Sequence, residues 1–227
     1  GPVTAVIEQI GARALLGFPP GHNGNLGVAD LSFAFRPPIG VGLSVDAGVV
    51  KGGGYLFIDA ARGEYAGVLE LMFADFLAIR AIGLITTKNP DGTPGFSLLI
   101  VLSVEFGTGI QLGFGFTLLA VGGLVGLNRT MNLAALMDGV RSGAIESVMF
   151  PQDVVANAPR ILSDLRRFFP VKQGTFLIGP MIKLGWGTPT LVSVSVGIII
   201  EIPGNIAIVG ILKLALPSAD AALILLQ

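Results

Sequence analysis

Apolar and polar side chains alternate with period two along most of the chain between residues 28 and 120. In residues 96–106, for example, Leu98, Ile100 and Leu102 fall on one side while Ser97 and Ser103 fall on the other. This alternation is typical of strands, in which successive side chains point to opposite faces of a sheet. We therefore predict strands over residues 28–35, 41–47, 55–60, 64–73, 77–86, 96–106 and 110–120.

Short segments rich in glycine, proline and asparagine separate these predicted strands. Connections of this length do not allow a parallel crossover, so consecutive strands are predicted to pair antiparallel. We expect turns at residues 36–38 (RPP), 51–54 (KGGG), 61–63 (ARG), 89–92 (NPDG) and 107–109 (GTG).

The stretch from residue 106 to residue 128 carries no charge and is long enough for a membrane-spanning helix. Its alternation argues otherwise, because Ile110, Leu112, Phe114 and Phe116 would share one face of a strand. It also contains several glycines, and each would cost about 1 kcal/mol in a helix interior. We predict a buried strand followed by a glycine-rich turn.

The pattern changes to helical spacing between residues 130 and 170. Asn132 is a suitable cap for a short helix over the following sequence LAALMDGVRSG, and residues 143–150 add a further helical turn before Pro151. Pro159 then opens an amphipathic helix over residues 159–169. The apolar side of this helix carries Ile161, Leu162, Leu165, Phe168 and Phe169. The helix is predicted to pack on the sheet through Leu162, Leu165 and Phe169.

Strand patterns resume after the helical segment, over residues 175–178, 181–186, 191–202, 206–216 and 221–226. The fold class predicted is mainly β with a short helical insertion: an antiparallel meander forming a curved sheet, sandwich or groove, with two or three short helices. The strand 221–226 is apolar and would leave an unpaired edge. We therefore expect residues 1–227 to form one β-rich domain, or a slice of a larger protein, with strands over 28–120, helices over 130–170 and strands over 174–227.

Composition supports extensive burial. The 227 residues are 52% hydrophobic and only 13% charged, with mean hydropathy +0.79, whereas soluble domains carry about 25% charged residues. The formal net charge is −1 and no basic run occurs, so nucleic acid is not expected as a partner. The chain has no cysteine and one histidine. Its first residues lack a basic, apolar leader pattern and assign no localisation.

Sequence motifs for catalysis or cofactor binding are not found, and we predict no catalytic, cofactor or metal residue. His22 is expected in a solvated loop, Trp186 as a core aromatic at a strand end, and Asn128 as a cap at the turn into the first helix. Several carboxylates lie singly on predicted strands, where we expect them on a wet face or paired with Arg80 or Lys183. These carboxylates are Asp46, Asp59, Glu70, Glu105 and Glu201.

Four runs of the sequence carry a resemblance to a known family: GVGLSVDAGVVKGGGYLFID, GFSLLIVLSVEFGTGIQLGFGFTLLAVGGLVGLNRT, AIESVMFPQDVVANAPRILSDLRRFFP and FLIGPMIKLGWGTPTLVSV. Together they resemble a family of large, β-rich microbial proteins known only as a domain of unknown function. The resemblance covers nearly the whole chain. It implies a segment of a long protein, and it supplies no activity, cofactor or catalytic residue.

Many predicted strands are apolar on both faces, and such a sheet must be covered on both sides. The leading hypothesis is a non-enzymatic structural or binding module of a larger β-rich protein, whose apolar face packs on a second sheet or holds lipid or another apolar ligand. Expected partners are neighbouring strands of a longer chain, a second copy contacting the terminal strand, or that ligand. A membrane-associated or membrane-inserted protein is the alternative, and an enzyme with an unrecognised site is third. The candidate apolar-face residues are Leu98, Ile100, Leu102, Phe114, Phe116, Val194, Val196 and Ile198.

Overall fold

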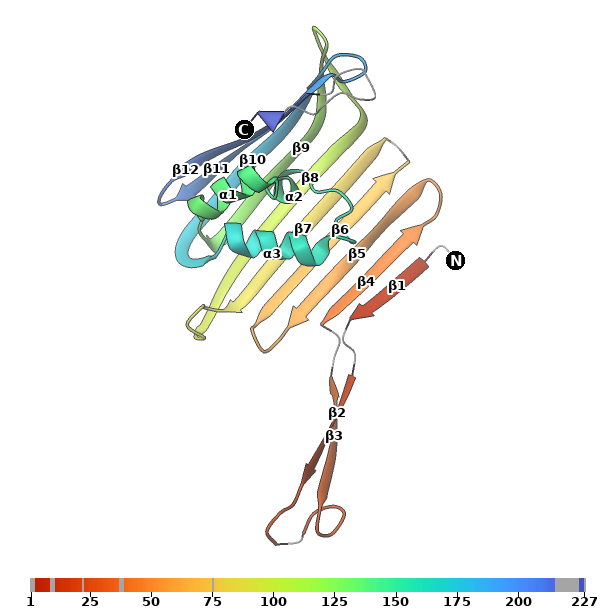
Figure 1. Cartoon of the computed structure of the whole chain (residues 1–227), viewed down its shortest axis with the longest axis vertical. Coiled ribbons are helices and arrows are strands. Elements are labelled where there is room, and N and C mark those ends of the chain that lie inside the picture. Colours follow the sequence, from red (N-terminus) through yellow and green to blue (C-terminus); the bar gives the residue numbers. More distant parts are fainter. Residues whose placement is uncertain are drawn as a thin grey trace.

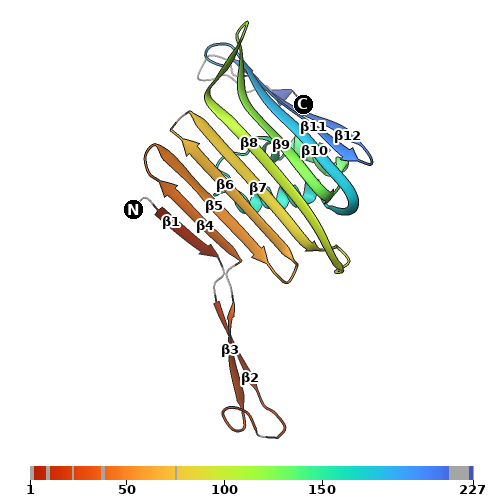
Figure 2. The same cartoon turned by 180° about the vertical axis from the view of Figure 1, so that it is seen from behind.

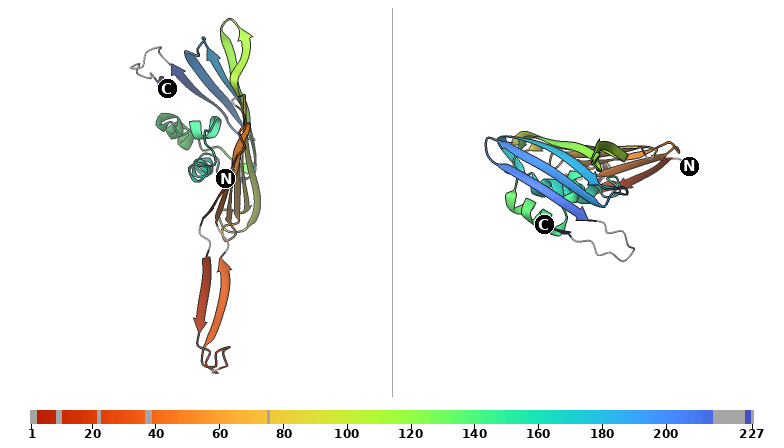
Figure 3. Two further views of the ribbon diagram at one scale, coloured as in Figure 1. Left: turned by 90° about the vertical axis from the view of Figure 1, so that its right-hand side faces the viewer. Right: turned by 90° about the horizontal axis from the view of Figure 1, so that it is seen from above.

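A computed structural model describes residues 3–8, 11–21, 23–36, 39–74, 76–214 and 225–226. The chain forms one wide, open antiparallel sheet with three short helices against one face and a long hairpin extending from one edge (Figure 1). The sheet bends toward the helices, which therefore lie on its concave side (Figure 3). The predicted fold class, a curved antiparallel sheet with a helical insertion, is confirmed.

The sheet contains eleven strands within the described residues, and from β4 to β12 consecutive strands pair with one another, while the other neighbour of β4 is β1. All of these pairs are antiparallel, as a meander requires. The order is β1 (Val3–Glu8), β4 (Gly40–Asp46), β5 (Val50–Asp59), β6 (Glu64–Phe73), β7 (Leu77–Lys88), β8 (Pro94–Gly113), β9 (Phe116–Arg129), β10 (Val171–Trp186), β11 (Val192–Ile202), β12 (Ile206–Leu214) and β13 (Leu225–Leu226).

The hairpin is a separate two-stranded sheet of β2 (Gly11–Gly17) and β3 (Asp30–Arg36), inserted between β1 and β4 (Figure 2). The alternation of the sequence predicted neither β1 nor β2, and it placed β3 about two residues early. β1 and β2 are short strands outside the region of clear alternation. The residues His22, Pro37 and Pro38 lie outside the described part of the chain, as do residues 221–224 of the predicted terminal strand.

The helices α1 (Leu133–Ser142), α2 (Glu146–Met149) and α3 (Ala158–Phe168) all lie between β9 and β10. Asn132 caps α1, since its side chain accepts a hydrogen bond from the Ala135 backbone N–H at 3.1 Å. Gly143 ends α1 in the left-handed conformation, with φ of 75°. Pro159 stands in the first turn of α3, as predicted.

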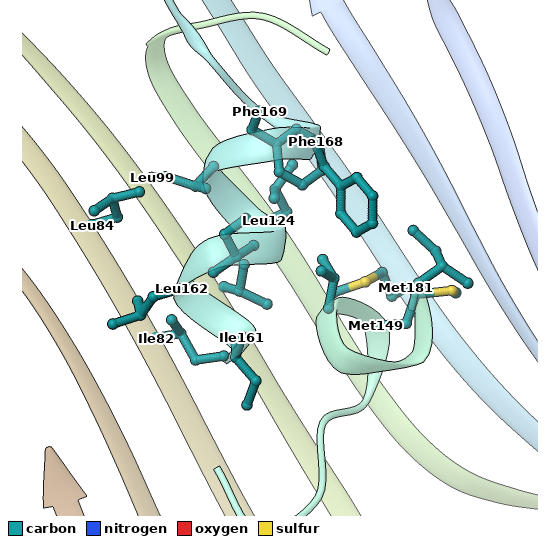
Figure 4. Packing of buried hydrophobic residues seen from close by; sticks show 14 of the residues in the cluster. Ile82, Leu84, Leu99, Leu124, Met149, Ile161, Leu162, Phe168, Phe169 and Met181 are labelled. Atoms are coloured by element: carbon teal, nitrogen blue, oxygen red, sulfur yellow. The ribbon is translucent and has the colours of Figure 1, made fainter. Parts of the chain in front are cut away.

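The core lies between α3 and the strands β7 to β9 (Figure 4). The helix buries its apolar stripe against the sheet, and Leu165 is 1% exposed. The sheet side of this contact includes Ile82, Leu84 and Leu99, which are equally well buried. The predicted packing of α3 on the sheet is confirmed, and it places the three-helix segment over the middle of the concave face.

The hairpin turn between β8 and β9 lies further along the chain than predicted. Residues 107–109 belong to β8, where a register shift between Glu105 and Ile110 marks a β-bulge. The chain instead reverses at Phe114, which has φ of 51°, between two glycines that also have positive φ. The predicted pairing of adjacent antiparallel strands is therefore correct, and the predicted position of the turn is wrong.

The glycine run at residues 52–54 was also predicted as a turn, but it lies inside β5. A Cβ atom on Gly52 would lie 2.5 Å from the Glu70 carbonyl oxygen, and one on Gly53 would lie 2.5 Å from the Leu43 carbonyl oxygen. These glycines therefore permit close approach of β4 and β6 to β5. The turn falls just before them, where the Ala47 N–H donates to the Val50 carbonyl at 2.9 Å.

Two strands predicted at residues 175–178 and 181–186 are one continuous strand, β10. Gly179 and Pro180 stay in register with Leu124 and Gly123 of β9, so these turn-forming residues do not interrupt the ladder. No helix in the described part of the chain is both long and apolar enough to span a membrane. The uncharged stretch that raised that question is a strand, a tight turn and a second strand.

Candidate functional site

The two faces of the sheet differ sharply in chemistry. Residues paired across an antiparallel ladder share a face, so the registers assign each side chain from β4 to β12 to one side. One side lies under the helices and carries the buried residues Val68, Ile82 and Val101. We call the opposite side the bare face; at its centre are Leu43, Leu56, Leu69, Ile100, Leu102, Val125, Ile178 and Ile198.

Apolar residues occupy the bare face almost without interruption. At its paired positions from β4 to β12, Tyr65 and Trp186 are the only side chains that carry a polar atom. Its large side chains are partly open to solvent, including Leu102 at 48% and Ile208 at 74%. Nine strands at a spacing of about 4.8 Å make this face roughly 40 Å wide. The apolar area of the bare face is therefore of order 1,000 Å² or more. This exceeds the largest apolar patch usual on a monomeric protein, which is ~300–600 Å².

The predicted apolar-face residues fall mostly on this surface. Six of them lie on the bare face within β8 and β11: Leu98, Ile100, Leu102, Val194, Val196 and Ile198. Phe116, at the start of β9, also belongs to it, in register with Trp186 of β10. Phe114 does not, because it forms the tip of the β8–β9 turn and is 99% exposed.

Charged side chains lie instead on the helix-covered face, where four of them form an ionic network together with the amide of Gln152. The Arg80 guanidinium donates from Nε to Glu70 at 2.6 Å, from Nη1 to Glu105 at 2.5 Å and from Nη2 to Gln152 at 3.0 Å. Lys183 Nζ donates to the other oxygen of Glu105 at 2.9 Å. Burial raises the pKa of Glu105, but hydrogen bonds from Gln152, Lys183 and Arg80 outweigh it and lower the pKa to about 2.

The ionic network has a structural role, because it joins a loop to several strands of the sheet. Arg80 is 5% exposed and each of its three hydrogen bonds is to a different side chain, so its charge is fully compensated. Gln152 comes from the loop between α2 and α3, and the network therefore ties that loop to β6, β7, β8 and β10. The expected pairing of Glu70 and Glu105 with Arg80 or Lys183 is confirmed.

Two other buried polar groups hold the ends of the helical segment. Arg129, 2% exposed, donates to the Phe169 carbonyl at 3.0 Å and to Thr86 Oγ1 at 2.6 Å. Burial lowers the pKa of Arg129 to about 10. Glu201 accepts hydrogen bonds from the Met131 N–H at 3.1 Å and from Thr130 Oγ1 at 2.8 Å. Arg129 was not among the predicted residues, because its only signal in the sequence is a lone charge at a strand end.

Other residues considered from the sequence have local structural roles. Trp186 is 45% exposed at the end of β10, so its prediction as a core aromatic was wrong. The Asn128 side chain donates to the Phe96 carbonyl at 2.8 Å and accepts from the Gly174 N–H at 2.9 Å, linking strands rather than capping the first helix. Asp46 and Asp59 accept hydrogen bonds from backbone N–H groups in the turns that follow them.

A cavity of about 310 Å³ opens beside the ionic network. Its walls are mainly apolar, with Met72, Leu77 and Phe106 among them, and its charged lining residues Glu105 and Lys183 are already paired with each other. Within the described residues, no group of three or more His, Cys, Asp or Glu side chains could hold a metal ion. The bare face is therefore the most distinctive candidate surface of the molecule.

These features define a class of protein: an open, curved β-meander whose concave face carries helices over an ionic network and whose opposite face is apolar. The whole chain, residues 1–227, matches the model of a family of unknown function, DUF6603, and the chain belongs to that family. No curated protein and no solved structure matches the chain. The resemblance to a domain of unknown function is thereby confirmed.

Proposed function

We propose that this chain is a non-enzymatic structural module of a larger β-rich protein, and that its bare face packs against a second β-sheet. The observation that carries the proposal is the separation of the two faces. A sheet with one face in water normally places polar side chains on that face. Here the ionic residues Glu70, Arg80 and Glu105 lie under the helices, and the face without helices is apolar.

The shape and composition of the bare face favour a sheet as its partner. Small apolar ligands are usually bound in concave sites, whereas the bare face lies on the convex side of the bend (Figure 3). Its side chains are mainly Val, Ile and Leu on a regular pleat, which is the surface through which two sheets pack about 10 Å apart. No lysine or arginine occupies its paired positions from β4 to β12, so it lacks the cations that attract a surface to anionic lipid.

Sedimentation of the purified chain tests this proposal, because another copy of the chain supplies a second sheet of matching width in that solution. We expect the chain to self-associate and expect Leu102→Lys, at the centre of the bare face, to weaken association at least tenfold. The matched control is Leu133→Lys on α1, which replaces a leucine of similar exposure (45% against 48%) outside the bare face. It should leave association unchanged.

Two results would overturn the proposal. A monomer that carries no lipid would mean that the bare face is stable in water. Stoichiometric lipid in an organic extract of the protein, lost in Leu102→Lys, would replace the sheet partner with a lipid and would mean that the bare face holds an apolar ligand.

A further inference from the structure

A second cavity lies on the opposite side of the sheet from the bare face, between α2 and the strands β10 to β12. Its volume is about 140 Å³. The sheet contributes two lysines and two serines to its lining: Lys183, Ser193, Ser195 and Lys213. We call this cavity the lysine pocket.

The strand registers bring these four residues together from distant parts of the sequence. Lys183 of β10 is in register with Ser195 of β11, and Ser193 of β11 is in register with Lys213 of β12. Ser193 and Ser195 are two positions apart on one strand and so share a face. The two hydroxyl groups therefore lie between two ammonium groups on the concave side of the sheet.

The polar groups of the lysine pocket are rich in unused hydrogen-bond donors. Each ammonium group has three N–H donors. Lys183 uses one on Glu105 at 2.9 Å and Lys213 uses one on Glu146 at 2.5 Å. Neither Ser193 nor Ser195 has a side-chain hydrogen bond to another described residue.

The charge of the lining is also positive. Lys183 and Lys213 both line the pocket, whereas Glu146 is the only carboxylate that does so among the residues that define it. Glu105, the partner of Lys183, is held by Arg80 and Gln152 in the neighbouring ionic network. A ligand complementary to these groups carries negative charge and several acceptor oxygens.

We propose that the lysine pocket binds a phosphate group. Lysine ammonium groups are common phosphate ligands because they act as compact charges with rotatable donors. A volume of 140 Å³ leaves room for such a group together with a few waters, each of which occupies about 30 Å³. Met149, Phe150 and Ile211 form an apolar wall that can contact an organic substituent on the phosphate. The site is independent of the bare face.

Two-dimensional ¹H–¹⁵N NMR of the whole chain tests the site, first with inorganic phosphate at constant ionic strength. We expect saturable shifts at the backbone amides of Ser193 and Ser195. Lys213→Gln should weaken binding at least fivefold, because it removes one of the two ammonium groups. Lys51→Gln, which removes another exposed lysine paired with a carboxylate, is the matched control and should bind as the unmodified chain does.

A second titration uses a short-chain phosphatidic acid below its micelle concentration and distinguishes the two sources of a phosphate group. Equal affinities for inorganic phosphate and phosphatidic acid would show that the site recognises the phosphate group alone. Tighter binding of phosphatidic acid would show that it recognises a phospholipid headgroup. Ser195→Ala, which removes a donor without changing charge, should also weaken binding and provides a second variant if Lys213→Gln is unfolded. Shifts that do not saturate, or equal affinity in all variants, would overturn the proposal.

Discussion

Replacing Leu165 with Ala tests how firmly α3 is seated on the sheet. The Leu165 side chain is 1% exposed, between the helix and the concave face. Leu→Ala changes at buried sites cost about 2–5 kcal/mol, and the cost rises when the surroundings cannot collapse into the cavity. Leu165 packs on a hydrogen-bonded sheet, whose strands cannot easily move into the cavity that the substitution leaves. We therefore expect a loss in the upper part of that range, about 3–5 kcal/mol.

Urea unfolding followed by circular dichroism and by fluorescence measures this loss. Trp186 is the only tryptophan and stands at the exposed end of β10, so its signal reports on the sheet rather than on α3. Coincident transitions would show that helix and sheet unfold together. The control is Leu133→Ala on α1, where the leucine is 45% exposed and the loss should be below about 1 kcal/mol. A loss below about 0.5 kcal/mol for Leu165→Ala would refute the packing argument.

Two further substitutions test the ionic network and the contact between α1 and α3. Glu105 has a folded pKa of about 2 against an ordinary value of 4.5, so its stabilisation is present above pH 4.5 and lost as pH falls toward 2. Glu105→Gln should lower the unfolding free energy at pH 7 by roughly 3 kcal/mol and flatten its pH dependence between 4.5 and 2. Urea midpoints equal to those of the unmodified chain at every pH in this range would contradict this expectation. Gly139→Ala should destabilise the protein, although alanine favours helix by about 1 kcal/mol, because its Cβ would lie 2.6 Å from Phe168 Cζ. Thermal unfolding measures the change, and Phe168→Leu in the same chain should recover part of it if the clash is the cause.

The arrangement of strands and helices was largely accessible from the sequence because periodicity is local information. Period two identified the strands from residue 28 onward, and Asn132 and Pro159 marked two helix starts. Glycine runs misled the prediction of turns because glycine has two uses that a sequence does not separate. It adopts positive φ in turns, as at Gly115, and it also omits a Cβ where strands approach closely, as at Gly52.

The candidate surface was only partly accessible for a related reason. Alternation fixes which residues of one strand share a face, and it therefore grouped Leu98, Ile100 and Leu102 correctly. It fails where a bulge and a turn intervene, which is why Phe114 was grouped with them. Alternation also cannot tell which face the helices cover. That choice depends on long-range partners such as Gln152, a loop residue that hydrogen-bonds Glu105 across 47 positions of sequence.

The meander from β4 to β12 has a consequence for how this sheet assembles. Consecutive strands in this range pair with one another, so most ladders join neighbouring segments of the chain. Sheets built from such local contacts close short loops and fold faster than sheets with distant pairings. A hairpin gained or lost at an edge would change the width of the sheet without re-pairing the remaining strands. The width of the sheet can therefore vary among related chains while the helical segment keeps its place over β7 to β9.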